Sequence, residues 1–211
     1  MKGKLERRVY EAENLEIREE ENKPKKIVGY AAVFDKLSVP LWGFREKITK
    51  GAFKKSVEGN KVKALWNHNS DYPLANQKRG TLFLEEDEKG LRFEMELPDN
   101  SWGRDAEVSI KRGDTDGVSF AFQTIKDEWD KSDEKNIIRT LIEAELHEIS
   151  PTPFPAYPQT KVAVRTAEEV YNEFLAAEVQ ADEAAREEQR KVSQAAELRK
   201  RKLKLIELEV N

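Results

Sequence analysis

Apolar and polar residues alternate most clearly in the stretch 90-GLRFEMEL-97, which predicts a strand with one face toward water. The segment 80-GTLFL-84 precedes it across the polar linker EEDEK, so the two segments predict a β-hairpin. Further strands are expected at 27–34, 61–66, 117–125 and 136–149. Short helices are expected at 50–58 and at 101–114, the second with Asn100 or Ser101 as its N-cap.

This order of elements predicts the fold class. Strands separated by turn residues and interrupted by two short helices favour a closed or half-closed antiparallel sheet. We therefore expect an α+β fold with a mostly antiparallel, β-barrel-like core, peripheral helices and a long C-terminal helix.

The C-terminal segment has a different character. From Thr166 to Asn211 the sequence contains strong helix formers and neither Gly nor Pro, which predicts one long helix or two with a frayed junction. Its charges are segregated, acidic from Glu168 to Glu188 and basic from Arg190 to Lys204. A thin apolar seam at coiled-coil spacing is formed by Val170, Phe174, Ala177, Ala181 and Ala184. The segment is either a solvated helix or a helix for self-association or docking. The expected organisation is an N-terminal arm (1–26), a folded domain (27–165) and a charged helical tail (166–211).

The amino-acid composition excludes several kinds of functional site and binding partner. The 211 residues suffice for one substantial core, and the formal net charge of -4 offers no overall attraction to nucleic acid. The absence of cysteine excludes disulfides, a thiolate nucleophile and Cys-ligated zinc. Two histidines give no recognisable metal-ligand spacing, so neither a metal nor a cofactor is expected. No apolar run reaches membrane-spanning length and no signal peptide is visible, which predicts a soluble cytoplasmic chain without a membrane partner.

One serine stands inside the apolar run 116-DGVSFAF-122. In a strand, Val118, Phe120 and Phe122 face one way, while Ser119 shares the other face with glycine and alanine. Such a strip of small residues is either close packing within a sheet or room for a substrate beside a nucleophilic hydroxyl.

The two histidines, His68 and His147, are the candidate bases. His68 lies at the end of the apolar alternation of 61–66, where it is either a base beside a substrate or a structural residue that bonds a loop carbonyl.

The second histidine lies in the segment 145-ELHEISPTPFPAYP-158. In a regular strand one face holds Ile138, Ile142, Ala144, Leu146 and Glu148. The other face holds Arg139, Glu143, Glu145 and His147. Glu148 would then be buried and in need of a partner, such as an imidazole that it orients, although one β-bulge would exchange the two faces. After Ser150 the prolines are expected to lead the chain out of the sheet.

Several of these segments together resemble the prohead maturation proteases of tailed phages, which are related in fold to the herpesvirus assemblins. The resemblance runs from about Ile27 to Arg165, in that family's order. It rests on 28-VGYAAVFD-35, 48-ITKGAFKKSV-57, 65-LWNHN-69, 80-GTLFLEEDEKGL-91, 116-DGVSFAF-122 and 146-LHEISPTPFPAYP-158.

The resemblance implies a serine endopeptidase that works inside the assembling prohead in the host cytoplasm. Its substrates would be scaffold protein or a scaffolding segment of the major capsid protein, and the enzyme itself. The nucleophile would be Ser119 and the general base His68. The third member would be Glu148, or His147 by analogy with the assemblins.

Two further points stay open at the level of sequence. The loop 111-KRGDTDG-117 is the candidate source of oxyanion-binding amides. The charged tail supports an alternative, a noncatalytic assembly or scaffolding protein, whereas a metal-dependent hydrolase has little support.

Overall fold

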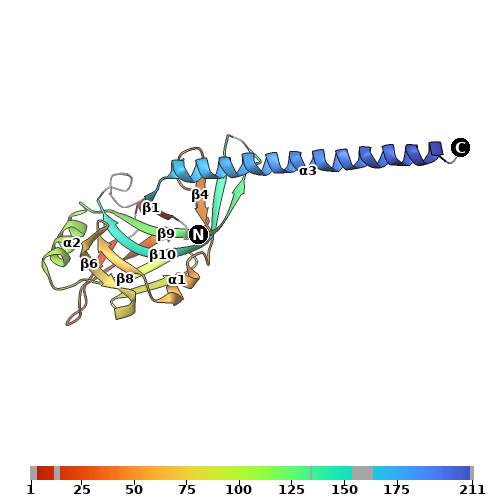
Figure 1. Ribbon diagram of the computed structural model, residues 1–211. Helices are drawn as coiled ribbons and strands as arrows, with labels where there is room; N and C mark the ends of the chain where they lie inside the picture. The colour runs from red at the N-terminus through yellow and green to blue at the C-terminus, as the bar shows by residue number, and fades with distance from the viewer. Residues whose placement is uncertain (1–3, 12–14, 134, 154–163, 210–211) are drawn as a thin grey trace. The chain divides into compact units, whose positions relative to one another are not determined.

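The computed structural model describes residues 4–11, 15–133, 135–153 and 164–209, and Figure 1 shows its elements. The chain divides into two compact units, residues 1–167 and residues 168–211. The described part of the first unit carries two sheets and the helices α1 and α2, and the second unit is part of one long helix. The predicted α+β class with a C-terminal helix is confirmed.

The larger sheet is built around two long strands, β9 (Gly117–Asp130) and β10 (Ile138–Thr152), which pair antiparallel. Its strand order is β11-β1-β9-β10-β5-β6, and β4 pairs with the first half of β10. The remaining strands are β1 (Leu5–Glu11), β4 (Arg45–Ile48), β5 (Lys63–Trp66), β6 (Asn69–Asn76) and β11 (Val164–Arg165). Strands β4 and β5 both run parallel to β10, so this sheet is mixed.

The smaller sheet is antiparallel throughout, in the order β2-β3-β8-β7. Its strands are β2 (Glu16–Arg18), β3 (Lys26–Val33), β7 (Leu82–Glu86) and β8 (Gly90–Glu96). The predicted hairpin of β7 and β8 is confirmed.

The predicted helices are also present, with shifted bounds. Helix α1 (Lys54–Gly59) starts later than expected, after a turn. Helix α2 (Ser101–Arg112) begins at the N-cap Asn100, whose side chain accepts a hydrogen bond from the amide of Gly103. A short 3-10 helix, η1 (Gln77–Arg79), follows β6.

The C-terminal segment forms one helix, α3 (Ala167–Glu209), rather than two. Every side chain from Val179 to Glu197 is exposed. None of the helices within the described ranges combines the length and hydropathy needed to cross a membrane.

The barrel-like arrangement of the core is not confirmed. The described strands form two open sheets, and no ladder among them joins the sheets into a ring. Three of the four strands that end these two orders are poor templates for further pairing, because β11 has two residues, β2 has three and β6 carries Pro73.

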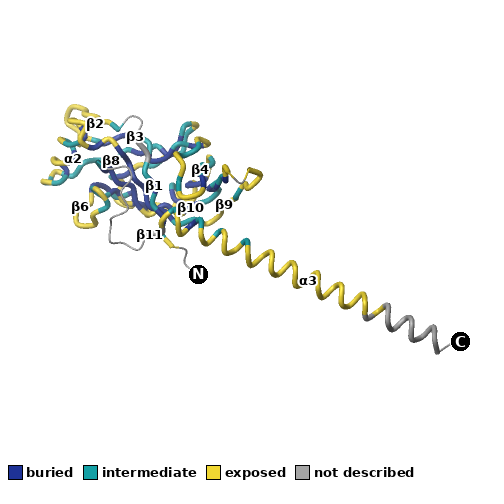
Figure 2. The backbone as a smooth tube through the Cα atoms, turned by 90° about the horizontal axis from the view of Figure 1, so that it is seen from above, coloured by how far each residue is buried: buried dark blue, intermediate teal, exposed yellow. Residues whose placement is uncertain are grey.

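The hydrophobic core is shared by both sheets and both short helices. The smaller sheet contributes Ile27, Leu91, Phe93 and Met95, and the larger contributes Phe120, Phe122, Leu141, Leu146 and Ile149. Buried backbone accordingly runs through the centre of the first unit in Figure 2. Phe53, just before α1, meets the ring of Phe120 edge-on at 5.6 Å between centroids. The phenylalanines of β9 thus face the core, as their alternation predicted.

The prediction for β10 was wrong in its faces, because the strand carries bulges. Its register with β9 shifts between Leu141 and Ala144, so Arg139 and Leu141 are buried as well as Ala144 and Leu146, contrary to the regular alternation. It shifts again between Leu146 and Glu148. The strand also continues through Pro151 to Thr152, beyond the expected exit after Ser150, whereas Pro155 and Pro158 lie outside the described residues.

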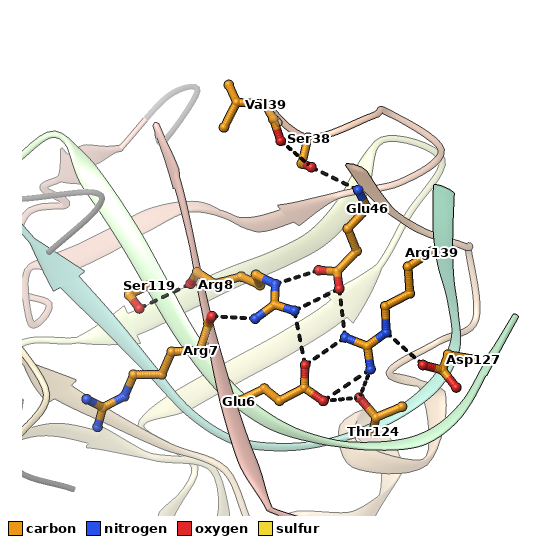
Figure 3. A network of polar contacts seen from close by, with 10 residues as sticks. All are labelled: Glu6, Arg7, Arg8, Ser38, Val39, Glu46, Ser119, Thr124, Asp127 and Arg139. Atoms are coloured by element: carbon orange, nitrogen blue, oxygen red, sulfur yellow. Dashed lines mark hydrogen bonds and ion pairs between the residues drawn. The ribbon is translucent and has the colours of Figure 1, made fainter. Parts of the chain in front are cut away.

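A network of buried charges replaces apolar packing where β1, β4 and β10 meet (Figure 3). Arg8 of β1 donates to both carboxylate oxygens of Glu46, at 2.7 and 2.8 Å. Arg139 of β10 donates to Glu46 at 2.9 Å and to Glu6 at 2.7 Å. Two carboxylates and two guanidinium groups therefore neutralise one another, and they tie the N-terminal strand to the sheet.

Glu6 illustrates the balance in this network. Burial alone would raise the pKa of its carboxyl, but hydrogen bonds and charge from Arg139, the charge of Arg8 and the hydroxyl of Thr124 outweigh burial and lower the pKa to about 2. A carboxylate whose pKa is lowered in the folded state stabilises the fold above its unfolded pKa, and loses that effect as pH falls through the folded value.

We expect Glu6→Gln to lower the free energy of unfolding at pH 7 by about 3 kcal/mol, because two guanidinium groups lose a buried partner. Urea denaturation between pH 7 and pH 2 measures this. The wild-type free energy should fall between pH 4.5, the ordinary value, and about pH 2, and the variant should show a shallower fall. The control is Glu16→Gln, since the Glu16 side chain is 59% exposed, and its effect should stay within about 0.5 kcal/mol. Equal effects of the two substitutions would contradict the role of the network.

Candidate active site

Strand β9 presents a row of small residues on the face opposite the core. Ser119 pairs directly with Val9 of β1 and with Ser150 of β10, and Ala121 lies between Arg7 and Glu148 in the same way. Residues directly opposite in antiparallel strands project to the same face. The strip that the sequence left undecided therefore forms the floor of a polar cluster.

His68 is held beside this row by a tight hairpin. Trp66 of β5 pairs with Asn69 of β6, so only Asn67 and His68 lie between them. Both have positive φ, 49° and 61°, which a two-residue turn of type I′ requires and which a histidine rarely adopts. The hairpin is fixed to the end of β10, because the amide of Asn67 donates to the carbonyl of Pro151 at 3.1 Å. The expected polar loop after His68 is thus strand β6.

The imidazole of His68 contacts the carboxylate of Glu148 directly. Nδ1 lies 2.6 Å from Oε1 of Glu148, and the two side chains are 9% and 10% exposed. With Nδ1–H donating to the carboxylate, Nε2 remains as the acceptor, which is the tautomer that a general base needs. The structure thus brings together two residues that lie 80 positions apart in the sequence.

Glu148 has further partners on the same face. Ser150 donates from its hydroxyl to Oε2 at 3.0 Å, and a guanidinium nitrogen of Arg7 lies 3.5 Å from Oε1. Burial would raise the pKa of this carboxyl, but the hydrogen bond and charge of His68, the charge of Arg7 and the hydroxyl of Ser150 together lower it. Glu148 is therefore a carboxylate at neutral pH, able to hold the imidazole.

A β-bulge decides which of the two neighbouring candidates enters the cluster. Leu146 pairs with Phe122 and Ile149 with Phe120, so three steps along β10 match two along β9. His147 is the extra residue and is exposed, while Glu148 falls on the face of Ser119. The expectation that Glu148 shares a face with Leu146 was wrong, although its expected burial and its contact with an imidazole are both present.

Ser119 itself is fully buried, and its hydroxyl donates to the backbone carbonyl of Arg8 at 3.1 Å. A hydroxyl has one hydrogen, so in this state the proton is directed to β1 and not to His68. Hydrogen bonds between nucleophile and base are often unformed without substrate.

Three backbone amides of the candidate oxyanion loop already have hydrogen-bond partners within the fold. The amides of Gly113, Asp114 and Thr115 donate to carbonyls at the end of α2, with Asp114 bonding Ser109 at 2.9 Å. These three amides close the helix and are not free to bind an oxyanion.

Sequence reasoning missed Arg7 and gave Ser150 no role. Ser150 could have been found, because residues two positions apart on a strand project to the same face, and Ser150 follows Glu148 at that distance. Arg7 gave no signal, since the charged run 5-LERRVYE-11 does not alternate between apolar and polar residues. Within the described ranges, no cluster of three or more His, Cys, Asp or Glu side chains could hold a metal ion.

Comparison with known proteins assigns most of the chain to a family. Residues 13–173 match the model of the caudovirus prohead serine proteases. The prohead protease of Enterobacteria phage HK97 is 30% identical over 139 residues, which are 64% of this chain and 57% of that protein. The chain thus spans little more than half the length of this relative.

A solved structure is also similar, that of the bacteriophage T4 capsid assembly protease. The similarity has a TM-score of 0.46 and 12% sequence identity, and it covers 72% of this chain and 100% of that chain. The family match includes β9, β10 and the hairpin of His68, and it extends over most of the chain. The chain therefore belongs to the caudovirus prohead serine protease family.

Proposed function

We propose that this chain is a serine endopeptidase with Ser119 as nucleophile, His68 as general base and Glu148 as the residue that orients the base. The observation that carries the proposal is the 2.6 Å contact between Nδ1 of His68 and Glu148, on the face of the sheet where Ser119 lies. His147 is a weaker third member because it is exposed.

The chemistry follows from these positions. The hydroxyl of Ser119 turns from the carbonyl of Arg8 toward Nε2 of His68, which accepts the proton as Oγ bonds to the scissile carbonyl carbon. The imidazolium, stabilised by Glu148, then gives that proton to the leaving amine as the C–N bond breaks. Water, deprotonated by His68, hydrolyses the resulting ester and restores Ser119.

The proposed substrates follow from the family and from the names of the two relatives, a prohead protease and a capsid assembly protease. We infer cleavage of scaffold protein, or of a scaffolding segment of the major capsid protein, inside the assembling prohead in the host cytoplasm, together with self-cleavage. The catalytic residues all lie in the unit of residues 1–167, so we assign proteolysis to that unit.

We further propose that α3 associates with a second copy of the chain. The helix is acidic in its first half and basic in its second, so an antiparallel pair would set opposite charges against each other along its length. The exposed part of the seam, Ala177, Ala181 and Ala184, would form the contact, because Val170 is already buried within one chain.

Replacing Ser119 or His68 by Ala should abolish cleavage. The first change removes the hydroxyl that attacks the substrate, and the second removes the base that accepts its proton. The expected loss in kcat is about a millionfold, judged from a comparable triad. Coexpression of each variant with scaffold and capsid protein, followed by mass spectrometry, measures it. Scaffold cleavage by a folded Ser119→Ala variant would end the assignment of the nucleophile and would favour a noncatalytic assembly role.

Replacing the third member should separate Glu148 from His147. Glu148→Gln keeps the shape but loses the charge that holds the imidazole, and a loss of about ten-thousandfold is expected. His147→Gln should keep cleavage within about threefold, because the side chain is exposed on the bulge. Peptide cleavage assays with circular dichroism of both variants test this. A dead His147→Gln beside an active Glu148→Gln would reassign the third member.

Removing residues 168–211 should leave cleavage of a short peptide unchanged and lower the mass measured by light scattering. Within the full chain, Ala181→Lys should weaken association because it places a charge in the seam, and high salt should weaken it through screening. The matched control is Val179→Lys, since Val179 is exposed on the opposite side of the helix. The same mass for both variants and the wild type would contradict association through this seam.

A further inference from the structure

Arg7 reaches the catalytic cluster from a strand that the family match does not include. The match begins at residue 13, whereas Arg7 lies in β1. Its guanidinium lies 3.5 Å from Oε1 of Glu148, the same oxygen that contacts His68. The two side chains are 13% and 10% exposed, so water screens this ion pair only in part.

Ala121 makes the contact between Arg7 and Glu148 sterically feasible. Strands β1 and β10 flank β9, and Ala121 is the register partner of both Arg7 and Glu148. Because the alanine side chain is a single methyl group, the two long side chains can meet across β9. The bulge at His147 is what brings Glu148 to this row.

We propose that Arg7 is a positioning residue of the active site, and the proposal rests on the triad given above. Its charge fixes the Glu148 carboxylate and opposes protonation of His68 in the free enzyme. Both effects come from one cation beside one shared oxygen.

The two effects act in a defined direction. A carboxylate with a cationic partner stays ionised and oriented, which preserves the tautomer of His68. A second positive charge near the imidazole disfavours imidazolium, so removing Arg7 should make His68 easier to protonate. In this proposal Arg7 widens the pH range of activity on the acid side, and it does so by lowering the proton affinity of the His68 imidazole.

Other charges near this site are more exposed to solvent. Lys63 of β5 is the register partner of Glu148, and Asp71 of β6 lies on the hairpin that carries His68; both side chains are exposed. On the same face β9 contributes Gly117, Ser119 and Ala121, which carry no charge. Lys63 thus provides a matched control, a cation on a neighbouring strand that solvent screens.

The test is an NMR titration of the imidazoles in the full chain carrying Ser119→Ala. The chain has two histidines, and His147→Gln assigns their signals. Adding Arg7→Gln should move the protonation curve of His68 upward by about one pH unit, because a nearby positive charge is lost. Arg7→Lys should restore most of the original curve, and Lys63→Gln should move it by less than about a third as much. A His68 curve that is unmoved in Arg7→Gln, or moved equally by Lys63→Gln, overturns the proposal.

Activity supplies the second readout, with Ser119 intact. In Arg7→Gln the acid limb of the kcat/KM profile should move upward with the NMR curve, and kcat on the alkaline plateau should fall, because the Glu148 carboxylate that orients His68 is less well fixed. A lower plateau with an unmoved limb would mean a merely structural role and would also overturn the proposal. If the NMR curve moves but no variant or wild type cleaves substrate, the placement of Arg7 stands and the proteolytic function fails. Should Arg7→Gln not fold, Arg7→Met replaces it, and failure of both neutral variants beside a folded Arg7→Lys would make Arg7 structural and overturn the proposal.

Discussion

The alternation of side chains along β9 is the constraint on which the rest of this structure depends. Phe120 and Phe122 fill the core that the two sheets share, so Ser119 and Ala121 must face the other way. Strand β10 has to supply apolar residues to the core and a carboxylate to the site, which regular alternation after Leu146 would not allow. The bulge at His147 solves this by shifting the register one residue before Glu148. One extra residue thus determines which side chains lie on the face of the candidate site.

The buried charge network has a comparable role on the core face. Apolar residues at these positions could stabilise the sheet as well, since buried ion pairs seldom exceed hydrophobic packing in net stability. Removing one member is costly, however, and this makes pairing of β1 in another register unfavourable. Register matters here because Arg7 lies beside Glu148 and the carbonyl of Arg8 accepts a hydrogen bond from Ser119. A shift of one residue would send Arg7 to the core and Arg8 to the site. The main effect of the network is therefore to fix the pairing register of β1, and its net contribution to the stability of the fold is secondary.

The elements that sequence predicted well are those in which local pattern and burial agree. Strand β8 alternates regularly, and α2 begins at a side-chain cap, so both were found close to their observed bounds. Strand β1 was missed because Glu6 and Arg8 occupy its core face, where the pattern requires apolar residues. The pairing of His68 with Glu148 depended on family resemblance together with burial, since 80 positions separate them. The bulge and the turn at His68 arise from tertiary register, which no local pattern encodes.

In the proposed mechanism the hydroxyl of Ser119 must leave the carbonyl of Arg8, either by turning or by movement of β1, and these two changes differ greatly in free energy. Turning the hydroxyl toward His68 exchanges one hydrogen bond for another, a change of about 1 kcal/mol. Moving β1 away would expose Glu46 and Arg139 without their partners, which is worth several kcal/mol in buried ion pairs. Activation of the hydroxyl therefore leaves β1 in place, with Arg7 still beside Glu148. Ser119 has no exposed surface, so the proposed mechanism also needs a rearrangement that brings a scissile carbonyl to its hydroxyl. In the proposed mechanism, access of substrate to Ser119 therefore requires more structural change than activation of its hydroxyl.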